Sequence, residues 1–315
     1  MLFARCIEQR EIAAQRKAYA SHWRSIAAQY APTPDAGFHP ATPRLRSSSC
    51  FFFSPVDTQI PMTTILEIQH LTKSFGKLKA VDDLSMTIQA GECVAFMGQN
   101  GAGKSTTMRS IAGLSQFDSG KIVICGQDIV ESPVEARKHL GFVPQDLALY
   151  QYLTAEEFLS MVGRIRGLAH DNLERAIAEL LELCDLKDAR NRMIREYSGG
   201  MARKIAMAGA LLGKPELIVL DESFVGLDPE STWQISEYLK QYVKQGGAVL
   251  ISSHILAMLH QMCSRFFILH HGRCVADCQR AEIDAMCQNP DTPNLTAIYL
   301  QKTGRSPLTG KPVAE

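Results

Sequence analysis

Residues 98–106 read "GQNGAGKST" and fit the pattern G-x-x-x-x-G-K-[ST]. The apolar run "CVAFM" at 93–97 precedes them and a segment with helical character follows, which is the strand–loop–helix context that this pattern requires. In such a loop the backbone N–H groups surround a phosphate, Lys104 reaches the β- and γ-phosphates, and Ser105 offers its hydroxyl to Mg²⁺. A glycine loop that merely turns the chain is the alternative, and this context disfavours it. The predicted phosphate-binding residues are Gly98, Gln99, Asn100, Gly101, Ala102, Gly103, Lys104, Ser105 and Thr106.

Strand and helix patterns alternate on both sides of this loop, which predicts an α/β fold with a mostly parallel sheet covered by helices. Strands are expected at 65–71, 80–88, 93–97, 121–126, 140–145, 217–222 and 248–254. Helices are expected at 104–114, 156–167, 171–184, 230–245 and 255–262, and one after Gly200. Only helices are expected across 150–196, so a helical lobe of about 146–200 is predicted to interrupt the sheet.

Residues 1–61 differ from the rest, with four prolines between positions 32 and 43 and a serine run. This composition predicts a disordered extension or a misassigned gene start, with the native product beginning at Met62. The domain is then expected to span 62–305, with helical character after Ala281 and a tail at 306–315.

Composition excludes some classes of function. The formal net charge is zero, so no overall basic field draws the chain to nucleic acid or anionic lipid. No apolar run approaches the roughly 20 residues that span a bilayer, so work at a membrane would need another chain to cross it.

The nine cysteines form no CxxC pair. Cys93 and Cys184 fall on apolar faces and indicate buried, reduced thiols. His270, His271, Cys274 and Cys278 are the nearest approach to a metal cluster, but their spacing favours a tight strand–turn–strand instead.

Polar residues follow three of the expected strands. Asp221 and Glu222 end the run "LIVL", where Asp221 can support a magnesium shell and Glu222 can polarise a water aimed at a γ-phosphate. A strand end that caps the next helix is the alternative. Gln145 and His254 also follow strands, and each alone is more typical of a structural residue. Their positions are nevertheless informative, because open α/β sheets bind ligands at the carboxyl ends of their strands.

A second potential anion site lies in "REYSGGMARK", residues 195–204. Ser198, Gly199 and Gly200 stand where a helix is expected to begin, with free N–H groups and a positive dipole end. One chain therefore carries two phosphate cradles about a hundred residues apart.

Seven motifs in order resemble the ATP-binding subunit of an ABC (ATP-binding cassette) transporter, and the resemblance runs from about Ile65 to Arg305. They are Phe75, the phosphate-binding loop, Gln145, "YSGGM", "LIVLDE", "GLDP" and His254. The resemblance implies a P-loop NTPase core with an antiparallel β subdomain and an inserted helical subdomain. It also implies ATP and Mg²⁺ as ligands.

The resemblance also implies a role for each motif. Phe75 is similar to the aromatic that stacks on adenine, Gln145 to the residue that joins magnesium to the transmembrane partner, and His254 to the switch at the γ-phosphate. "YSGGM" resembles the signature motif, and Asp228 lies in a loop similar to the one that couples two sites. In this family two cassettes pack head to tail, so that each ATP lies between one copy's phosphate loop and the other's signature, which accounts for two cradles on one chain.

Tyr197, Met201, Ser223 and Ile255 depart from the usual family pattern, yet none of them removes a catalytic group. Glu222, His254, Lys104 and Gln145 are therefore expected to serve catalysis, and Ser105, Gln145 and Asp221 to hold the metal.

Two stretches, "LALYQYLTAEEFLSMVGRIRGL" and "NLTAIYLQKTGR", resemble the bacterial exporter branch, whose partner is a separate six-helix permease; a plain loop, helix and solvated tail are the alternative. The expected protein is thus a peripheral ATPase at the cytoplasmic face of the inner membrane, paired with a permease and a second cassette. A soluble ABC ATPase acting on ribosomes or DNA is a second hypothesis, which the single cassette and the lack of a basic surplus disfavour. A regulatory subunit that never hydrolyses ATP is a third, and intact Glu222 and His254 argue against it.

Overall fold

A computed structural model describes residues 63–288 and 294–304. The chain divides into two units between Pro61 and Met62, and the described residues all belong to the second unit. The expectations for 1–61 and for the tail at 306–315 lie outside the described residues.

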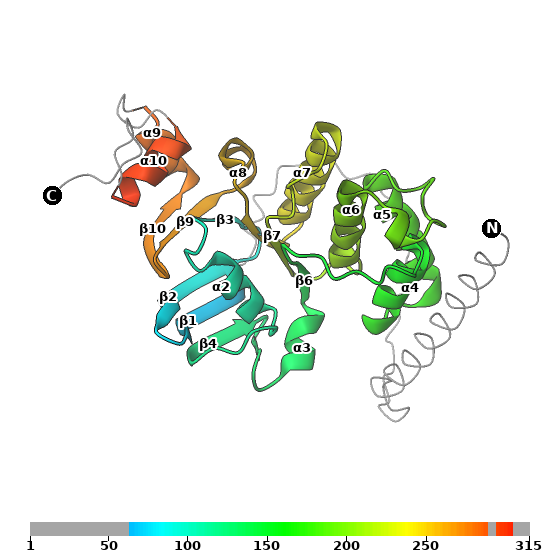
Figure 1. Ribbon diagram of the computed structural model, residues 1–315, viewed down its shortest axis with the longest axis horizontal. Coiled ribbons are helices and arrows are strands. Elements are labelled where there is room, and N and C mark those ends of the chain that lie inside the picture. Colours follow the sequence, from blue (N-terminus) through cyan, green and yellow to red (C-terminus); the bar gives the residue numbers. More distant parts are fainter. Residues whose placement is uncertain (1–62, 289–293, 305–315) are drawn as a thin grey trace, which may run out of the picture. The chain divides into compact units, whose positions relative to one another are not determined.

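Ten strands form two sheets in the described part of the chain (Figure 1). Their order is β2-β1-β4-β5 in a four-stranded antiparallel sheet and β10-β9-β3-β8-β7-β6 in a six-stranded sheet, where only the β9–β10 pair is antiparallel. The strands are β1 (Thr64–Phe75), β2 (Leu78–Gln89), β3 (Cys93–Gly98), β4 (Ser119–Ile124), β5 (Gln127–Asp128), β6 (Leu140–Val143), β7 (Leu217–Asp221), β8 (Ala248–Ser252), β9 (Arg265–His270) and β10 (Arg273–Gln279).

Helices cover the six-stranded sheet, and three of them form the helical lobe seen beyond β6 in Figure 1. The lobe helices are α4 (Ala155–Ile165), α5 (His170–Leu183) and α6 (Gly199–Leu211). The others are α2 (Lys104–Ile111), α3 (Pro133–Lys138), α7 (Pro229–Lys244), α8 (Leu256–Met262), α9 (Arg280–Met286) and α10 (Leu295–Lys302), with a 3₁₀ turn at Ile194–Glu196.

Both faces of β3, β6, β7, β8 and β9 in the six-stranded sheet are largely buried, because successive residues of these strands enter different cores. In β3, Ala95 and Met97 pack in a core with side chains from α4 to α8. Val94 and Phe96 instead pack with the four-stranded sheet and α2. This two-sided burial explains why "CVAFM" is a continuous apolar run rather than an alternating one.

The predicted α/β class, the antiparallel subdomain and the helical lobe are confirmed. The stripe predicted on α5 is buried, as are Cys93 and Cys184, and the seven described cysteines are free thiols. Burial raises the pKa of Cys184 to about 12, which makes that thiol unreactive. No helix in the described ranges is both long and apolar enough to cross a bilayer.

Several predicted element ends were too late, and one helix was missed. The strands expected at 140–145 and 248–254 end at Val143 and Ser252. The helix expected to reach residue 114 ends at Ile111, because Gly113 turns the chain with φ +66°. The strand expected to reach residue 126 ends at Ile124, because Cys125 and Gly126 form the hairpin turn between β4 and β5. Helix α3 was missed, since six residues are too few to establish a helical period.

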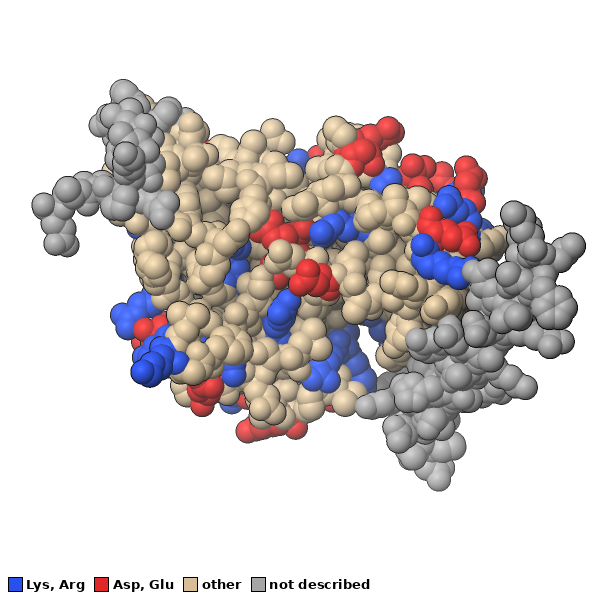
Figure 2. All heavy atoms as spheres, in the orientation of Figure 1, with Lys and Arg blue, Asp and Glu red and all other residues tan. Residues whose placement is uncertain are grey.

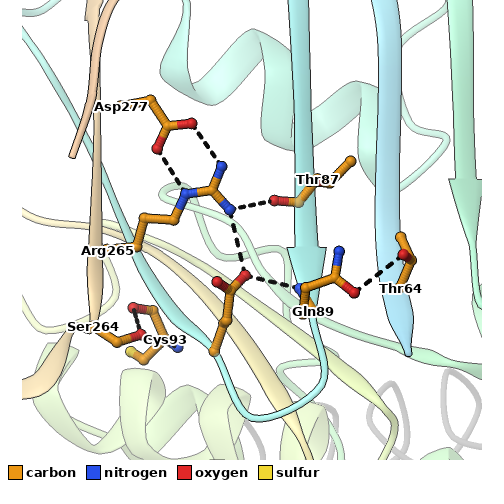
Figure 3. A network of polar contacts seen from close by, with 8 residues as sticks. Thr64, Thr87, Gln89, Cys93, Ser264, Arg265 and Asp277 are labelled. Atoms are coloured by element: carbon orange, nitrogen blue, oxygen red, sulfur yellow. Dashed lines mark hydrogen bonds and ion pairs between the residues drawn. The ribbon is translucent and has the colours of Figure 1, made fainter. Parts of the chain in front are cut away.

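A polar network joins the two sheets around Arg265 (Figure 3). The Arg265 guanidinium donates two hydrogen bonds to the Asp277 carboxylate, at 2.7 and 2.6 Å, and one to the Thr87 carbonyl at 2.9 Å. It also lies 3.5 Å from the Glu92 carboxylate, which accepts a hydrogen bond from the Gln89 N–H at 2.8 Å. Only 14% of the Arg265 side chain is exposed, so this one cation connects β9, β10 and β2 in a largely dry setting.

We expect Arg265→Ala to lower the free energy of unfolding by about 2 kcal/mol, because it leaves the Asp277 carboxylate and the Thr87 carbonyl without the Arg265 donor. Arg273→Ala is the matched control. Arg273 also joins the six-stranded sheet to β2, through Asp82 at 2.7 Å, but 67% of its side chain is exposed, so its loss should cost less than about 1 kcal/mol. Urea unfolding of both variants measures the difference, and equal losses would contradict the prediction.

Candidate functional site

A cleft of about 570 Å³ opens where the phosphate-binding loop meets the carboxyl ends of β6, β7 and β8. It is lined by Phe75, Leu78, Ala80, Gln99, Asn100, Gly101, Gly103, Lys104, Ser105, Thr106, Gln145, Arg203, Glu222, Val225 and His254. The structure therefore gathers most of the predicted nucleotide residues at one edge of the sheet, the edge where open α/β folds bind ligands. Gly98 and Ala102 belong to the same loop but are not among the residues that line the cleft.

Close packing explains the glycines of the loop. Gly103 has φ +104°, and a Cβ atom there would lie 2.3 Å from the backbone oxygen of Ala80. A Cβ atom at Gly98 would lie 2.9 Å from the Ala102 Cβ and 3.0 Å from the Leu269 oxygen. The loop can take this path only with glycine at these positions, which leaves its backbone N–H groups accessible to an anion.

Lys104 begins α2 and is 7% exposed. Its ammonium donates hydrogen bonds to the carbonyls of Gly98, at 2.8 Å, and Gln99, at 3.2 Å. Burial lowers the pKa of Lys104, although the carboxylates of Glu222 and Asp221 act in the opposite direction. An anionic ligand in the cleft would further favour the charged form of the Lys104 ammonium, so this lysine is positioned to bind a phosphate.

Asp221 ends β7 directly opposite Ser252 of β8 and is fully buried. Its Oδ1 accepts a hydrogen bond from the Ser252 hydroxyl at 2.7 Å, whereas its Oδ2 has no hydrogen-bond partner among the described residues. A buried carboxylate oxygen without a donor is costly unless a cation or an ordered water satisfies it. The residue therefore fits a role beside a divalent cation.

Glu222 follows in the left-handed region, with φ +48°. Its N–H bonds to Ser252, and its carboxylate accepts a hydrogen bond from the His254 N–H at 3.2 Å and lies 3.3 Å from the His254 Nε2. A side chain in this backbone region costs on the order of 1–2 kcal/mol. Such strain is typical of functional positions, and here it turns the Glu222 side chain into the cleft.

Phe75 and Gln145 occupy the accessible rim of the cleft. Phe75 is the last residue of β1 and is 56% exposed. The Lys73 ammonium lies 5.1 Å from the centre of the Phe75 ring. Gln145 lies in the exposed bend after β6. The exposed Phe75 ring can stack on a planar base. The exposed Gln145 side chain can change position when its loop moves.

The second cradle does not line the cleft. Ser198 caps α6 by accepting a hydrogen bond from the Met201 N–H at 3.2 Å, and nothing within 4 Å would meet a Cβ at Gly199. Asp228 caps α7 through Ser231 and lies 3.4 Å from the Lys204 ammonium; the Ser231 hydrogen bonds lower its pKa most. The two anion sites of the chain thus stay separate within one copy.

Four residues of the cleft were missed, namely Leu78, Ala80, Arg203 and Val225. Arg203 stands on α6 and donates a hydrogen bond to the Glu222 carbonyl at 3.2 Å. Leu78, Ala80 and Val225 belong to no motif. Arg203 lies in the stretch quoted for the second cradle, but the sequence carries no signal that brings α6 next to the end of β7. The structure also explains why Ser223 can depart from the usual family pattern. Its buried hydroxyl donates hydrogen bonds to the carbonyls of Val143 and Asp221.

Charged side chains form small mixed groups on the face shown in Figure 2, where blue and red spheres alternate among tan ones. A broad basic surface, the usual footprint of nucleic-acid binding, does not occur on that face.

Comparisons with known proteins agree with this geometry. A family model described as "ABC transporter" matches residues 81–225. The linearmycin resistance ATP-binding protein LnrL of Bacillus subtilis is 38% identical over 212 residues, which are 67% of this chain and 68% of that protein. The Nod factor export ATP-binding protein I of Cupriavidus pinatubonensis is 34% identical over 224 residues, 71% of this chain and 69% of that protein.

A solved structure described as an ATP binding subunit of an ABC transporter superposes with a TM-score of 0.71 and 32% identity, over 76% of this chain and 100% of that one. A dimeric post-hydrolysis ATP-binding cassette, MJ0796, bound to ADP and phosphate, superposes with a TM-score of 0.64 at 24% identity, which supports the fold.

Gly103→Ala should weaken ATP binding at least about tenfold, since the added Cβ would displace the loop from Ala80. Gly167→Ala is the control, because Gly167 also has positive φ, +75°, but nothing within 4 Å of a Cβ. Titration with a fluorescent ATP analogue measures binding, and circular dichroism checks folding. Unchanged binding by a folded Gly103→Ala protein would refute this account of the loop.

Proposed function

The chain belongs to the ABC transporter family as an ATP-binding, ATP-hydrolysing subunit, and we propose that it powers export through a separate transmembrane permease. The observation that carries the proposal is the convergence of Lys104, Glu222 and His254 on one cleft beside the phosphate-binding loop. Phe75, Gln145 and the loop glycines are the proposed contacts for the rest of the nucleotide.

In the proposed mechanism Glu222 orients and polarises the water that attacks the γ-phosphate. His254 supports it, since its backbone N–H and its ring both lie within hydrogen-bonding reach of the carboxylate. Lys104 exchanges its two loop carbonyls for phosphate oxygens and offsets negative charge that develops in the transition state. The Arg203 contact with the Glu222 carbonyl helps to hold the strained backbone in place.

Magnesium suits the oxygen donors at this edge of the sheet, and the Asp221 Oδ2 without a donor is the structural feature that fits it. Ser105, Gln145 and Asp221 are the residues we propose to hold it. When bound, the ion would neutralise charge on the β- and γ-phosphates.

The working unit is proposed to be a head-to-tail pair of cassettes. Ser198, Gly199 and Gly200 lie outside their own chain's cleft, so this cradle can meet a γ-phosphate only if that phosphate belongs to another copy. ATP would then bridge the two chains, and its hydrolysis would let them part. Asp228 contacts the same helix, α6, through Lys204, which fits a role in coupling the two sites.

Export is favoured because relatives carry the names "Nod factor export" and "linearmycin resistance". The permease would supply the membrane path and choose the cargo, and this chain would attach at the cytoplasmic face through its helical lobe. A soluble ABC ATPase for ribosomes or DNA receives no support from these relatives. The mixed charge on the face shown in Figure 2 disfavours it too.

We expect Glu222→Gln to keep ATP affinity within a few-fold and to lower hydrolysis by at least about 100-fold, because the amide cannot accept the proton of the attacking water. Phosphate release measures the rate. Glu230→Gln, at the exposed start of α7, is the control and should match the parent. Hydrolysis by Glu222→Gln at the parent rate would exclude Glu222 as the base.

The same variant should form a stable dimer in Mg·ATP, since the bridge between the chains is no longer removed. Adding Ser198→Arg should abolish that dimer, because a large side chain then fills the second cradle without disturbing the first. Light scattering after size exclusion distinguishes the two states, and an ATP-dependent dimer of the double variant would contradict the head-to-tail arrangement.

The transporter assignment is tested by capture from the native host. Full-length Glu222→Gln, expressed there with Mg·ATP and isolated after gentle solubilisation, should retain a polytopic membrane protein in stoichiometric amount. Lys104→Ala, which should not hold ATP, is the control for nucleotide-dependent assembly. Recovery of ribosomes or DNA instead of a membrane protein would favour the soluble alternative.

A further inference from the structure

Three side chains with metal-binding donors meet at the opposite edge of the sheet from the nucleotide cleft. Cys125 lies in the turn between β4 and β5, His139 directly precedes β6, and Glu216 directly precedes β7. Their donor atoms all lie within 4.8 Å of one another, and the His139 Nδ1 is 2.9 Å from the Glu216 Oε2. None of the three lines the cleft, and none belongs to a motif found in the sequence.

Strand register fixes two members of this cluster. Leu140 and Leu217 are partners in the parallel pair of β6 and β7, so the residues just before them are neighbours as well. The Leu217 N–H donates a hydrogen bond to the His139 carbonyl at 2.9 Å, and the Ala248 N–H donates one to the Glu216 carbonyl at 2.9 Å. Because adjacent strands lie about 4.8 Å apart, the imidazole and the carboxylate start from a rigid, closely spaced base.

The third member comes from the other sheet. Cys125 and Gly126 form a two-residue hairpin turn with φ +48° and +80°, and the Cys125 N–H bonds to the Ile65 carbonyl at 2.9 Å. Asn, Asp or Gly is preferred at the first position of such a turn, so a cysteine there is unusual. Its backbone holds the half-buried thiol beside a histidine and a glutamate.

The geometry points to a metal site: we propose that Cys125, His139 and Glu216 bind one Zn²⁺ ion, with water or an external donor in the fourth position. A thiolate, an imidazole and a carboxylate together match zinc rather than Mg²⁺ or Ca²⁺, which prefer oxygen donors alone. Two ligand atoms of one tetrahedral zinc ion lie roughly 3.3–3.7 Å apart, so donors already within 4.8 Å must approach by about 1 Å, which side-chain rotations can supply.

Access and electrostatics are compatible with this assignment. The His139 and Glu216 side chains are 32% and 50% exposed, which gives an ion a path to the cluster. Burial and the nearby charge of Glu216 raise the pKa of Cys125 to about 11, so binding must displace the thiol proton. A cation between the sulfur and the carboxylate would stabilise the thiolate form that burial and Glu216 otherwise disfavour.

A bound ion would fasten the β4–β5 turn of the antiparallel sheet to the amino edge of the six-stranded sheet. It would therefore act as a clamp between the two sheets, on the side away from ATP. This role is independent of the proposed export function, and its test uses neither ATP hydrolysis nor a permease.

The test is titration of the full chain, freed of metal by a chelator, with Co²⁺ as a spectroscopic substitute for zinc. We expect one tightly bound ion per chain, with a thiolate-to-cobalt absorption band that added Zn²⁺ removes. Zn²⁺ should also raise the midpoint of thermal unfolding. Absence of the band, or Co²⁺ bound only at millimolar concentration, would overturn the proposal.

Variants assign the band to the cluster. Cys125→Ser should abolish it, and His139→Gln should weaken Co²⁺ binding at least tenfold. Two matched control variants should leave the absorption band and the Co²⁺ affinity unchanged. One is Cys274→Ser, at an exposed thiol, and the other is His70→Gln, where an exposed histidine also lies 2.8 Å from a carboxylate, that of Asp83, but outside any such cluster. A band that persists in folded Cys125→Ser would overturn the assignment, with circular dichroism as the check on folding.

Discussion

The parallel register between β7 and β8 sets the geometry of the nucleotide cleft. It places Asp221 opposite Ser252, whose hydroxyl donates a hydrogen bond to the Asp221 carboxylate. The carbonyl and hydroxyl oxygens of Ser252 in turn accept the N–H of the residue that follows β7. That residue is Glu222. Because these hydrogen bonds fix its backbone, its carboxylate lies where it accepts a hydrogen bond from the N–H of His254, just after β8. A slip of one residue would turn Asp221 and Glu222 to the wrong faces of a sheet that is buried on both sides.

The same arrangement supports the proposal that ATP binds between two copies of the chain. The phosphate-binding loop, Glu222 and His254 enter the cleft from the sheet, whereas α6 presents Ser198 and Gly199 elsewhere. A helix start with free N–H groups and no acidic residue in its first turn has an affinity for anions that its own chain's ATP does not satisfy. Two copies related head to tail would satisfy both cradles with the same phosphate.

The sequence predicted those parts of the fold and site whose signals are local. The strand–loop–helix around Gly103 and Lys104, the apolar run before Asp221 and the buried stripe of α5 all lie within short windows. Arg203 could not be predicted, because it reaches the cleft only once α6 packs against the sheet. The cluster of Cys125, His139 and Glu216 could not be predicted for the same reason. The histidine and the glutamate are 77 positions apart in the sequence, and only strand pairing brings them together.

Strand β7 therefore carries chemistry at both ends. Glu216 stands before its first residue and Asp221 is its last, so a short, fully buried strand connects the proposed zinc cluster to the nucleotide edge. The other side of that cluster, the β4–β5 turn, belongs to the sheet whose strand β1 ends in Phe75. An ion at Cys125 would thus fix the position of the antiparallel sheet relative to the strands that carry Asp221 and Glu222. Because the proposed adenine contact and the proposed catalytic carboxylate stand on different sheets, a clamp between those sheets acts on the distance that a bound nucleotide must span.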